Sequence, residues 1–218
     1  MIGGSAMRYS YIAFDVDGTL LDTERNELST LQRLVREATG REPSWDELIP
    51  TFGMTGPDAL VYLGCTPEQA AAVRPLWHDA SVESVQRTPL VAGFPETLET
   101  LSRAGVRMGL VTSRGQHTVA LRFPPEGEGR YFGERVCQQD TVRHKPDPEP
   151  LLECLHRAGV RPEDALYVGD SPFDMACAAN AGVDGALALW GTHTPDLACT
   201  WKLAHPSDLL KICLGQAE

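Results

Sequence analysis

The sequence predicts an α/β fold, in which a parallel sheet is covered by helices on both faces and an all-helical domain is inserted after the first strand. Short apolar runs alternate with longer segments of helical periodicity, which is typical of parallel strands joined by crossover helices. The stretch from about residue 23 to residue 87 is the exception, because it is helical in pattern throughout. We therefore expect an α/β core of residues 1–22 and 89–218, and a helical domain of residues 23–88, called the cap below.

The predicted strands are short apolar runs, and most of them end abruptly at polar or glycine-containing segments. Such runs are expected for strands that are buried on both faces of a sheet. The first run precedes two aspartates, and the fifth candidate is weaker than the others because it is only three residues long. The predicted strands are residues 11–14, 106–112, 165–170, 185–189 and 135–137.

The predicted helices are marked by their ends as well as by their periodicity. Residues 94–104 and 148–158 both run into an Ala-Gly-Val sequence, in which glycine suits the left-handed position just past a helix. Within the cap, residues 44–47 (Ser-Trp-Asp-Glu) have the pattern of a capping box, and residues 67–85 form a long Ala-rich segment. The aromatic residues of the cap, including Trp77, are expected in its core.

Bulk properties exclude several classes of protein. The formal net charge of −11 leaves no basic face for a nucleic-acid backbone. No apolar run reaches the length that spans a membrane. The six cysteines are scattered singly, which favours free thiols in a reducing compartment, so we expect a cytoplasmic protein. The composition leaves a monomer and a homodimer equally open.

Polar residues gather where the predicted strands end. Asp15 and Asp17 follow the first strand, Thr112 closes the second, Lys145 precedes a helix, and Asp170 closes a later strand. Paired acids such as these two are equally compatible with a solvated or helix-capping role when taken alone. Ligands of open parallel sheets bind beyond the carboxyl ends of the strands, however, and this is where all five residues fall.

Four aspartates brought into one crevice would repel one another unless a cation joined them. Carboxylate oxygens that leave room for water and phosphate are the ligands that Mg²⁺ prefers. A magnesium ion, together with one ammonium group, would hold a phosphoryl group against the negative field of the whole chain. The candidate metal-binding residues are Asp15, Asp17, Asp170 and Asp174.

Lys145 is the candidate for that ammonium group. The chain has only three lysines among its 19 basic residues, so arginine supplies most of its surface charge. A compact ammonium is the better choice where a point charge must lie between a carboxylate and a phosphate. Thr112 is expected to donate its hydroxyl hydrogen to a phosphoryl oxygen.

Four segments resemble the motifs of the haloacid dehalogenase superfamily, in the order that the family has them. The resemblance implies a Rossmann-like core, and the position of the cap resembles the subfamily with a helical cap after the first motif. Residues 95–98 and 189–191 look most like the phosphoglycolate phosphatase branch. The four segments are residues 14–23, the strand end at Thr112, residues 144–148 and residues 168–174.

The resemblance implies a role for each aspartate. Asp15 would be the nucleophile, and Asp17 would protonate the leaving group and then deprotonate water. Asp17 would also offer its backbone carbonyl to Mg²⁺, which Asp170 would ligate directly. Asp174 would lie in the outer coordination sphere or bind a metal-bound water.

The resemblance also implies which groups bind substrate. Thr112 and Lys145 would hold the phosphoryl group, and Ser113 would lie near it. Residues 51–57 form a Gly-rich turn between cap helices, at the position where this family places its specificity loop. The candidate residues in that turn are Phe52, Gly53 and Met54.

The function that follows is Mg²⁺-dependent hydrolysis of a small phosphorylated metabolite, such as phosphoglycolate, through an aspartyl-phosphate. Dehalogenases of the superfamily lack an acid at the position of Asp17, and phosphonate cleavage uses a cap lysine, which residues 23–87 do not contain. Three alternatives stay open: a pyrophosphatase, a hexose-phosphate mutase, and a non-catalytic phosphate-binding or regulatory protein.

Overall fold

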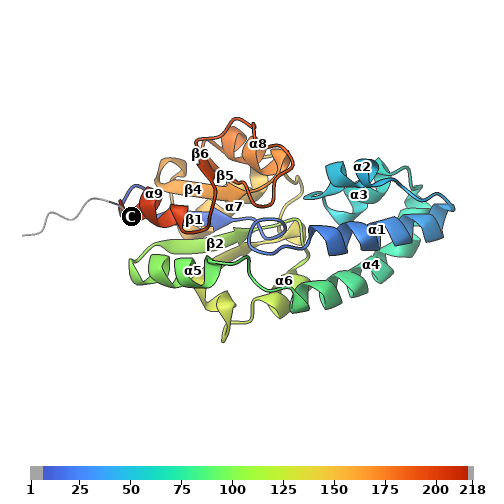
Figure 1. Ribbon diagram of the computed structural model, residues 1–218, viewed down its shortest axis with the longest axis horizontal. Helices are drawn as coiled ribbons and strands as arrows, with labels where there is room; N and C mark the ends of the chain where they lie inside the picture. The colour runs from blue at the N-terminus through green and yellow to red at the C-terminus, as the bar shows by residue number, and fades with distance from the viewer. Residues whose placement is uncertain (1–6, 216–218) are drawn as a thin grey trace, which may run out of the picture.

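The computed structural model describes residues 7–215, apart from the side chains at positions 74, 78, 79, 81 and 84. In this part of the chain, six parallel strands form one sheet in the order β3-β2-β1-β4-β5-β6 (Figure 1). The strands are β1 (Tyr11–Phe14), β2 (Arg107–Val111), β3 (Phe132–Val136), β4 (Ala165–Gly169), β5 (Asp184–Ala188) and β6 (Trp201–Leu203).

The strand order reverses on the two sides of β1. The strand has β2 on one side and β4 on the other, and Phe14 lies opposite both Leu110 and Val168. The residues that follow these three positions therefore leave the sheet at one edge and at one level. In an open α/β sheet, the crevice at such a switch point is the usual place for a ligand.

Helices cover both faces of the sheet, and alternate residues of β1 separate the two layers. Ile12 and Phe14 pack in a cluster with α5 and α9, whereas Tyr11 and Ala13 pack in a second cluster with α7 and α8. This alternation follows from the two-residue period of a strand. The core helices are α5 (Phe94–Arg103), α6 (Gln116–Arg122), α7 (Glu149–Ala158), α8 (Pro172–Ala181) and α9 (Asp208–Leu214).

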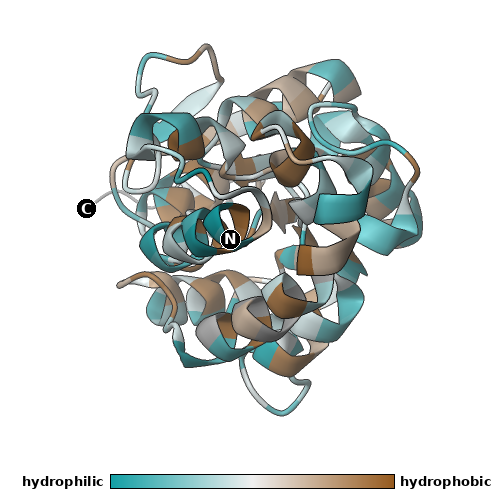
Figure 2. Cartoon of the chain, turned by 90° about the vertical axis from the view of Figure 1, so that its right-hand side faces the viewer, coloured by the Kyte–Doolittle hydropathy of each residue, from teal (hydrophilic) through white to brown (hydrophobic). Residues whose placement is uncertain are grey.

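The helices between β1 and α5 form their own apolar cluster, which includes Leu28, Leu34, Leu48 and Leu60. They lie together on the right of Figure 1, beside the part that contains the sheet. Figure 2 views the molecule from this side and shows that hydrophobic and hydrophilic positions both occur along the helices. These helices are α1 (Glu24–Thr39), α2 (Trp45–Leu48), α3 (Gly56–Tyr62) and α4 (Pro67–Arg87).

The α/β fold class predicted from the sequence is confirmed, and so is the capping box, in which Ser44 and Glu47 cap α2 reciprocally. Strand β6 and helix α9 were not predicted. Strand β6 has only three residues and α9 only seven, so neither is long enough to show a clear period. The boundaries between the core and the cap, at residues 22/23 and 88/89, remain a prediction.

Two further expectations concern the cysteines and the membrane. All six cysteines are free thiols, and Cys199 alone among them is not buried, in agreement with the absence of a disulfide framework. Within residues 7–215, no helix has both the length and the apolar character needed to cross a bilayer.

Phe94 should be one of the most sensitive positions for stability. Its side chain is fully buried and makes edge-to-face contacts with the rings of Phe14 and Trp190. We expect Phe94→Ala to lower the free energy of unfolding by about 3–5 kcal/mol, because it leaves a cavity between the sheet and α5. Urea denaturation should measure this loss. Leu121→Ala, at a side chain that is 39% exposed, is the control, and an equal loss in both variants would contradict the assignment.

Candidate active site

Asp15 is the first residue beyond β1, and the sheet fixes its position. Its backbone N–H donates to the carbonyl of Val168 on β4 at 2.9 Å, and the residue is only 3% exposed. The chain then turns sharply, with Gly18 at φ +74°. A Cβ atom at Gly18 would lie 2.3 Å from a carboxylate oxygen of Asp170, so both the left-handed backbone and the close approach require glycine here.

The segment after β4 carries Asp170 and Asp174. Asp170 follows the strand directly, and its Oδ1 accepts a hydrogen bond from the hydroxyl of Thr19 at 2.9 Å. Ser171 caps α8, and Ser171 and Asp174 form a reciprocal capping box with Pro172 in the first turn. The capping box determines where the carboxylate of Asp174 lies, because its Oδ2 accepts the N–H of Ser171 at 3.1 Å.

Lys145 joins two of these aspartates. Its Nζ lies 2.7 Å from Oδ1 of Asp15 and 2.7 Å from Oδ1 of Asp174, and its side chain is 3% exposed. The same Oδ1 of Asp174 accepts the hydroxyl of Tyr167 at 2.9 Å. The ammonium group is therefore held in a buried site by two carboxylates, one directly after β1 and one in the first turn of α8.

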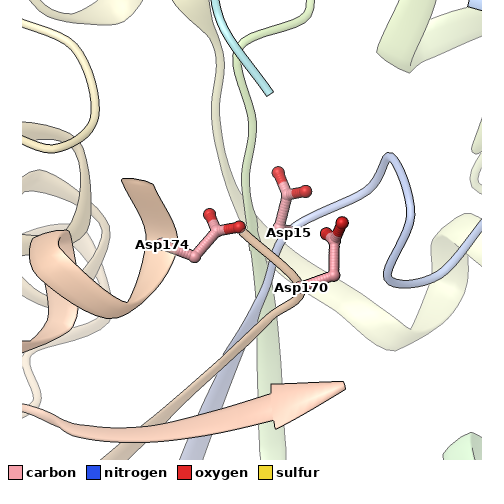
Figure 3. A group of neighbouring side chains, drawn as sticks. All are labelled: Asp15, Asp170 and Asp174. Atoms are coloured by element: carbon pink, nitrogen blue, oxygen red, sulfur yellow. The ribbon is translucent and has the colours of Figure 1, made fainter. Parts of the chain in front are cut away.

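Asp15, Asp170 and Asp174 are a plausible set of metal ligands by geometry. Each offers an oxygen atom, and the three atoms lie within 4.8 Å of one another (Figure 3). Carboxylate oxygens are the donors that Mg²⁺ prefers, so the group present fits this ion. Both oxygens of Asp174 already accept hydrogen bonds, from Lys145, Tyr167 and Ser171, so Asp15 and Asp170 are better suited to direct ligation.

Burial and like charges govern the ionisation of these groups. Burial raises the pKa of Asp15 to about 7, although the Lys145 ammonium opposes the rise. Burial, with the charges of Asp174 and Asp15, raises the pKa of Asp170 well above its usual range. Burial would also raise the pKa of Asp174, but Lys145 and its other hydrogen-bond donors outweigh burial and lower it. Two of the three acids therefore resist ionisation until a further positive charge arrives.

The side chain of Asp17 takes a different direction from the other three aspartates. Its two carboxylate oxygens are bound by the guanidinium of Arg114, with Nε to Oδ2 at 2.7 Å, and the hydroxyl of Thr23 also donates to Oδ1. The Asp17 carboxylate is thus not part of the group of three acids. The expected gathering of four carboxylates is therefore limited to three, and a metal contact of Asp17 would have to use its backbone carbonyl, as the family resemblance implies.

Thr112 and Ser113 follow β2, next to the end of β1. Thr112 is 5% exposed, and its Oγ1 accepts the N–H of Arg114 at 3.2 Å, which leaves its hydroxyl hydrogen available to another acceptor. The hydroxyl of Ser113 donates to the carbonyl of Gly53 at 2.8 Å. This contact brings the Gly-rich turn of the cap against the core beside Asp15.

A cavity of about 700 Å³ lies between the cap and the carboxyl edge of the sheet. Asp15 and Asp17 are at its base, and all three candidate residues of the cap turn contribute to its wall. Its described wall is mixed, with apolar residues mainly from the cap and polar residues mainly from the core. The residues of the cap turn are Phe52, Gly53 and Met54; the other apolar residues include Leu28, Leu31, Leu60 and Trp77; the polar residues include Ser113, Gln138, Gln139 and His144.

The loop after β5 packs against the turn after β1 and holds it in place. The indole of Trp190 donates to the carbonyl of Thr19 at 2.9 Å. A Cβ atom at Gly191 would lie 2.0 Å from the carbonyl oxygen of Gly18, so only glycine permits this approach. The Trp-Gly pair, which the sequence analysis used only as a mark of resemblance, thus has a structural function.

Most of the residues that line the cavity were not identified as site residues from the sequence. Among them, Arg114 and Glu27 form a buried ion pair at 2.8 Å, and Trp77 packs against the cap cluster, as expected, and also lines the cavity. The available signal for Arg114 was its position directly after Thr112 and Ser113. No local pattern distinguishes Glu27 from the other acids of α1, because its partner is 87 residues away.

Comparison with known proteins agrees with this architecture. Phosphoglycolate phosphatase 1 of Pseudomonas aeruginosa is 32% identical over 189 residues, which cover 83% of this chain and 69% of that protein. Pyrophosphatase PpaX of Bacillus velezensis is 32% identical, over 94% of this chain and 96% of that protein. A solved structure from Lactobacillus plantarum, provisionally assigned as a phosphoglycolate phosphatase, has a TM-score of 0.82 and 27% identity, over 94% of this chain and 100% of that one.

The family assignment rests on the greater part of the chain. Residues 12–188 match the family described as haloacid dehalogenase-like hydrolase, and this range includes all four segments that carry the polar residues of the site. The family resemblance found in the sequence is thereby confirmed. The chain belongs to the haloacid dehalogenase-like hydrolase family and is a phosphatase of that family.

Proposed function

We propose that the chain is a Mg²⁺-dependent phosphomonoester hydrolase in which Asp15 accepts the phosphoryl group. The contact between Lys145 and Asp15 is the observation that carries this proposal. In this contact, a buried carboxylate at the switch point of the sheet lies next to a fixed positive charge and to two more acids. A carboxylate nucleophile needs such a setting if it is to approach a dianionic phosphate.

The reaction proceeds in two displacements. An oxygen of Asp15 attacks phosphorus, the bond from phosphorus to the ester oxygen breaks, and Asp17, which must first take up a proton from solvent, gives that proton to the departing alkoxide. Asp17 then takes a proton from water, whose oxygen attacks the phosphorus of the aspartyl-phosphate and releases inorganic phosphate and the free carboxylate of Asp15. The exchange of one difficult step for two easier ones is the advantage of covalent catalysis.

The remaining groups hold the phosphoryl oxygens and the ion. Lys145 and Thr112 would bind phosphoryl oxygens, with the ammonium as a point charge and the hydroxyl as a donor. Asp15, Asp170 and the backbone carbonyl of Asp17 would hold Mg²⁺, and Asp174 would act through Lys145 and through water. When bound, the ion supplies positive charge that offsets the repulsion between the acids and the phosphate.

The substrate is a small phosphorylated metabolite, and phosphoglycolate is the first candidate because of the relative from Pseudomonas aeruginosa. Pyrophosphate is the second candidate, because the PpaX relative matches over nearly the whole length of both chains. A mutase would return the phosphoryl group to a sugar and would need a sugar bisphosphate for turnover. A cytoplasmic location and a monomeric or homodimeric state are further parts of this proposal.

Substitution of the two aspartates tests the chemistry. We expect Asp15→Asn to abolish both turnover and covalent phosphorylation, because an amide oxygen is a poor nucleophile. We expect Asp17→Asn to lower kcat/KM about 10²–10⁴-fold, which is the usual contribution of general acid–base catalysis. Steady-state kinetics, together with mass spectrometry of the acid-quenched enzyme, should measure both effects.

Asp22→Asn is the matched control for these two variants. Asp22 belongs to the same segment but is exposed, so this variant should retain the activity of the unmodified protein. Normal turnover by Asp15→Asn would assign the nucleophile to another residue.

Metal binding can be tested without a substrate. We expect Mg²⁺ to raise Tm in a saturable manner, because it relieves the repulsion within the group of three buried acids. At about 100 times Kd the stabilisation is about 2.7 kcal/mol, which corresponds to roughly 5–10 °C for a chain of this size. Thermal denaturation with increasing Mg²⁺, and with excess chelator, is the measurement.

The metal response should depend on Asp170. We expect Asp170→Asn to lose most of the Mg²⁺-dependent shift and Asp46→Asn, at an exposed position of the cap, to keep it. An undiminished shift in Asp170→Asn would place the ion elsewhere.

The cap turn should select the substrate without taking part in the chemistry. Phe52 and Met54 line the same cavity as Asp15, so we expect Phe52→Ala and Met54→Ala to change the relative kcat/KM within a panel that includes phosphoglycolate and pyrophosphate. Phosphorylation of Asp15 and its dependence on Mg²⁺ should persist in both. Val61→Ala, at a cap side chain that is 62% exposed, is the control. An unchanged order of substrates in both variants would exclude the turn from the specificity site.

A further inference from the structure

Arg114 lies at the centre of a buried ion-pair network beside the proposed catalytic aspartates. Its Nε donates to Oδ2 of Asp17 at 2.7 Å, and its Nη2 donates to both Oδ1 of Asp17 and Oε1 of Glu27, the latter at 2.8 Å. The side chains of Arg114, Asp17 and Glu27 are 7%, 15% and 12% exposed. The guanidinium is therefore bound by two carboxylates at a position that is largely shielded from bulk solvent.

The three residues of this network come from three different parts of the fold. Asp17 follows β1 and Arg114 follows β2, so both belong to the core, whereas Glu27 lies in the first turn of α1 in the cap. The other carboxylate oxygen of Glu27 accepts the indole N–H of Trp77 on α4 at 3.4 Å. Through Glu27, the guanidinium thus contacts the cap at the point where its two longest helices meet.

We propose that Arg114 is a positioning residue, which orients the carboxylate of Asp17 for proton transfer and links that orientation to the position of the cap through Glu27. This inference rests on the proposed function, in which Asp17 transfers protons to the leaving group and from water. It adds a residue that does not contact the phosphoryl group and acts only through Asp17.

The geometry of the contact is the first argument. Two donors of one planar guanidinium bind the two oxygens of one carboxylate, and this arrangement fixes the plane of the carboxylate as well as its position. The Thr23 hydroxyl donates to Oδ1 as well, so the rotation of the Asp17 side chain is restricted from two sides. Restriction of this kind matters for catalysis, because a displacement of about 1 Å can lower a rate about 100-fold.

The charge of the network is the second argument. One guanidinium lies between two carboxylates, so its removal would leave Asp17 and Glu27 buried together without a counterion. The two acids would then repel each other across the boundary between core and cap. A movement of α1 that carries Glu27 would, in turn, pull the guanidinium away from Asp17 or press it closer. The orientation of the proton-transfer group therefore follows the position of the cap.

The test is the dependence of kcat/KM on the leaving group, measured for the full-length protein with Mg²⁺. A series of substituted phenyl phosphates keeps size and charge nearly constant while the acidity of the departing phenol varies. Because kcat/KM includes only the steps up to phosphoryl transfer to Asp15, the later hydrolysis does not affect it. Protonation matters most for the least acidic phenol.

We expect Arg114→Ala to lower kcat/KM about 10–100-fold for phenyl phosphate and less than about 3-fold for 4-nitrophenyl phosphate. The slope of log kcat/KM against phenol pKa should become steeper and approach that of Asp17→Asn. If Arg114 had a merely structural role, its removal would lower kcat/KM for every substrate by the same factor. A uniform decrease, or no decrease, would overturn the inference.

Two further variants guard against loss of the fold. Arg114→Gln keeps a polar side chain with an amide donor but removes the charge and the paired donors of the guanidinium, and we expect it to steepen the slope in the same way. Arg122→Ala is the matched control. The side chain of Arg122 is also only 10% exposed and also forms an ion pair, but its partner is Glu128, away from the site. This variant should keep the slope of the unmodified protein. A slope that is unchanged in Arg114→Gln overturns the inference even where Arg114→Ala is unstable.

The link to the cap has its own test, in a double-mutant cycle of Arg114→Ala with Glu27→Gln. We expect Glu27→Gln alone to steepen the slope of log kcat/KM against phenol pKa. The slope of the double variant should be no steeper than that of Arg114→Ala, because the two residues act through one contact. Independent, additive effects would overturn the link.

The outcomes also separate this inference from the proposed function. If the unmodified protein phosphorylates Asp15 with none of the esters, the proposed function fails. If it does so and the slopes of the variants do not change, only the role of Arg114 fails.

Discussion

Repulsion among buried carboxylates is the constraint on which the rest of the site depends. Asp15, Asp170 and Asp174 lie within 4.8 Å of one another, and all three are nearly inaccessible to solvent. One ammonium group, that of Lys145, lies among them. Three carboxylates and one ammonium leave two formal negative charges, which is the charge that one Mg²⁺ would balance. The same deficit raises the pKa of Asp15 and Asp170, and a divalent cation would relieve it.

The surrounding backbone holds these charges together against their repulsion. The sheet places Asp15 through a hydrogen bond to β4, the capping box of α8 places Asp174, and Gly18 leaves room for the carboxylate of Asp170. The first and third of these are backbone features, and the second joins side chains to the backbone within one helical turn, so short-range contacts bring the acids near one another. An arrangement that rigid suits a site which must offer the same geometry before and after phosphoryl transfer.

Much of the fold and of the group of acids could be predicted from the sequence, because the relevant signals are local. A buried strand that ends in Asp-x-Asp, or a Ser-Pro-Phe-Asp segment that starts a helix, fixes its own geometry within a few residues. The contacts that escaped prediction are long-range: Arg114 meets Asp17 across 97 residues and Glu27 across 87. Strand β6 escaped for a different reason, since its three residues are too few to show a period. A single sequence contains no record of which acid a given arginine meets.

The two charge clusters of the site divide the work between core and cap. The cluster around Lys145 is built wholly from core segments, so its geometry does not depend on where the cap lies. The cluster around Arg114 takes Glu27 from the cap, and the hydroxyl of Ser113 makes a second bridge to Gly53 in the cap turn. In the proposed mechanism, phosphoryl and metal binding are therefore invariant, while proton transfer and the fit of the leaving group respond to cap position. Enclosure of the substrate by the cap and correct placement of the proton donor would then occur together, so that the leaving group is protonated only once the substrate is bound.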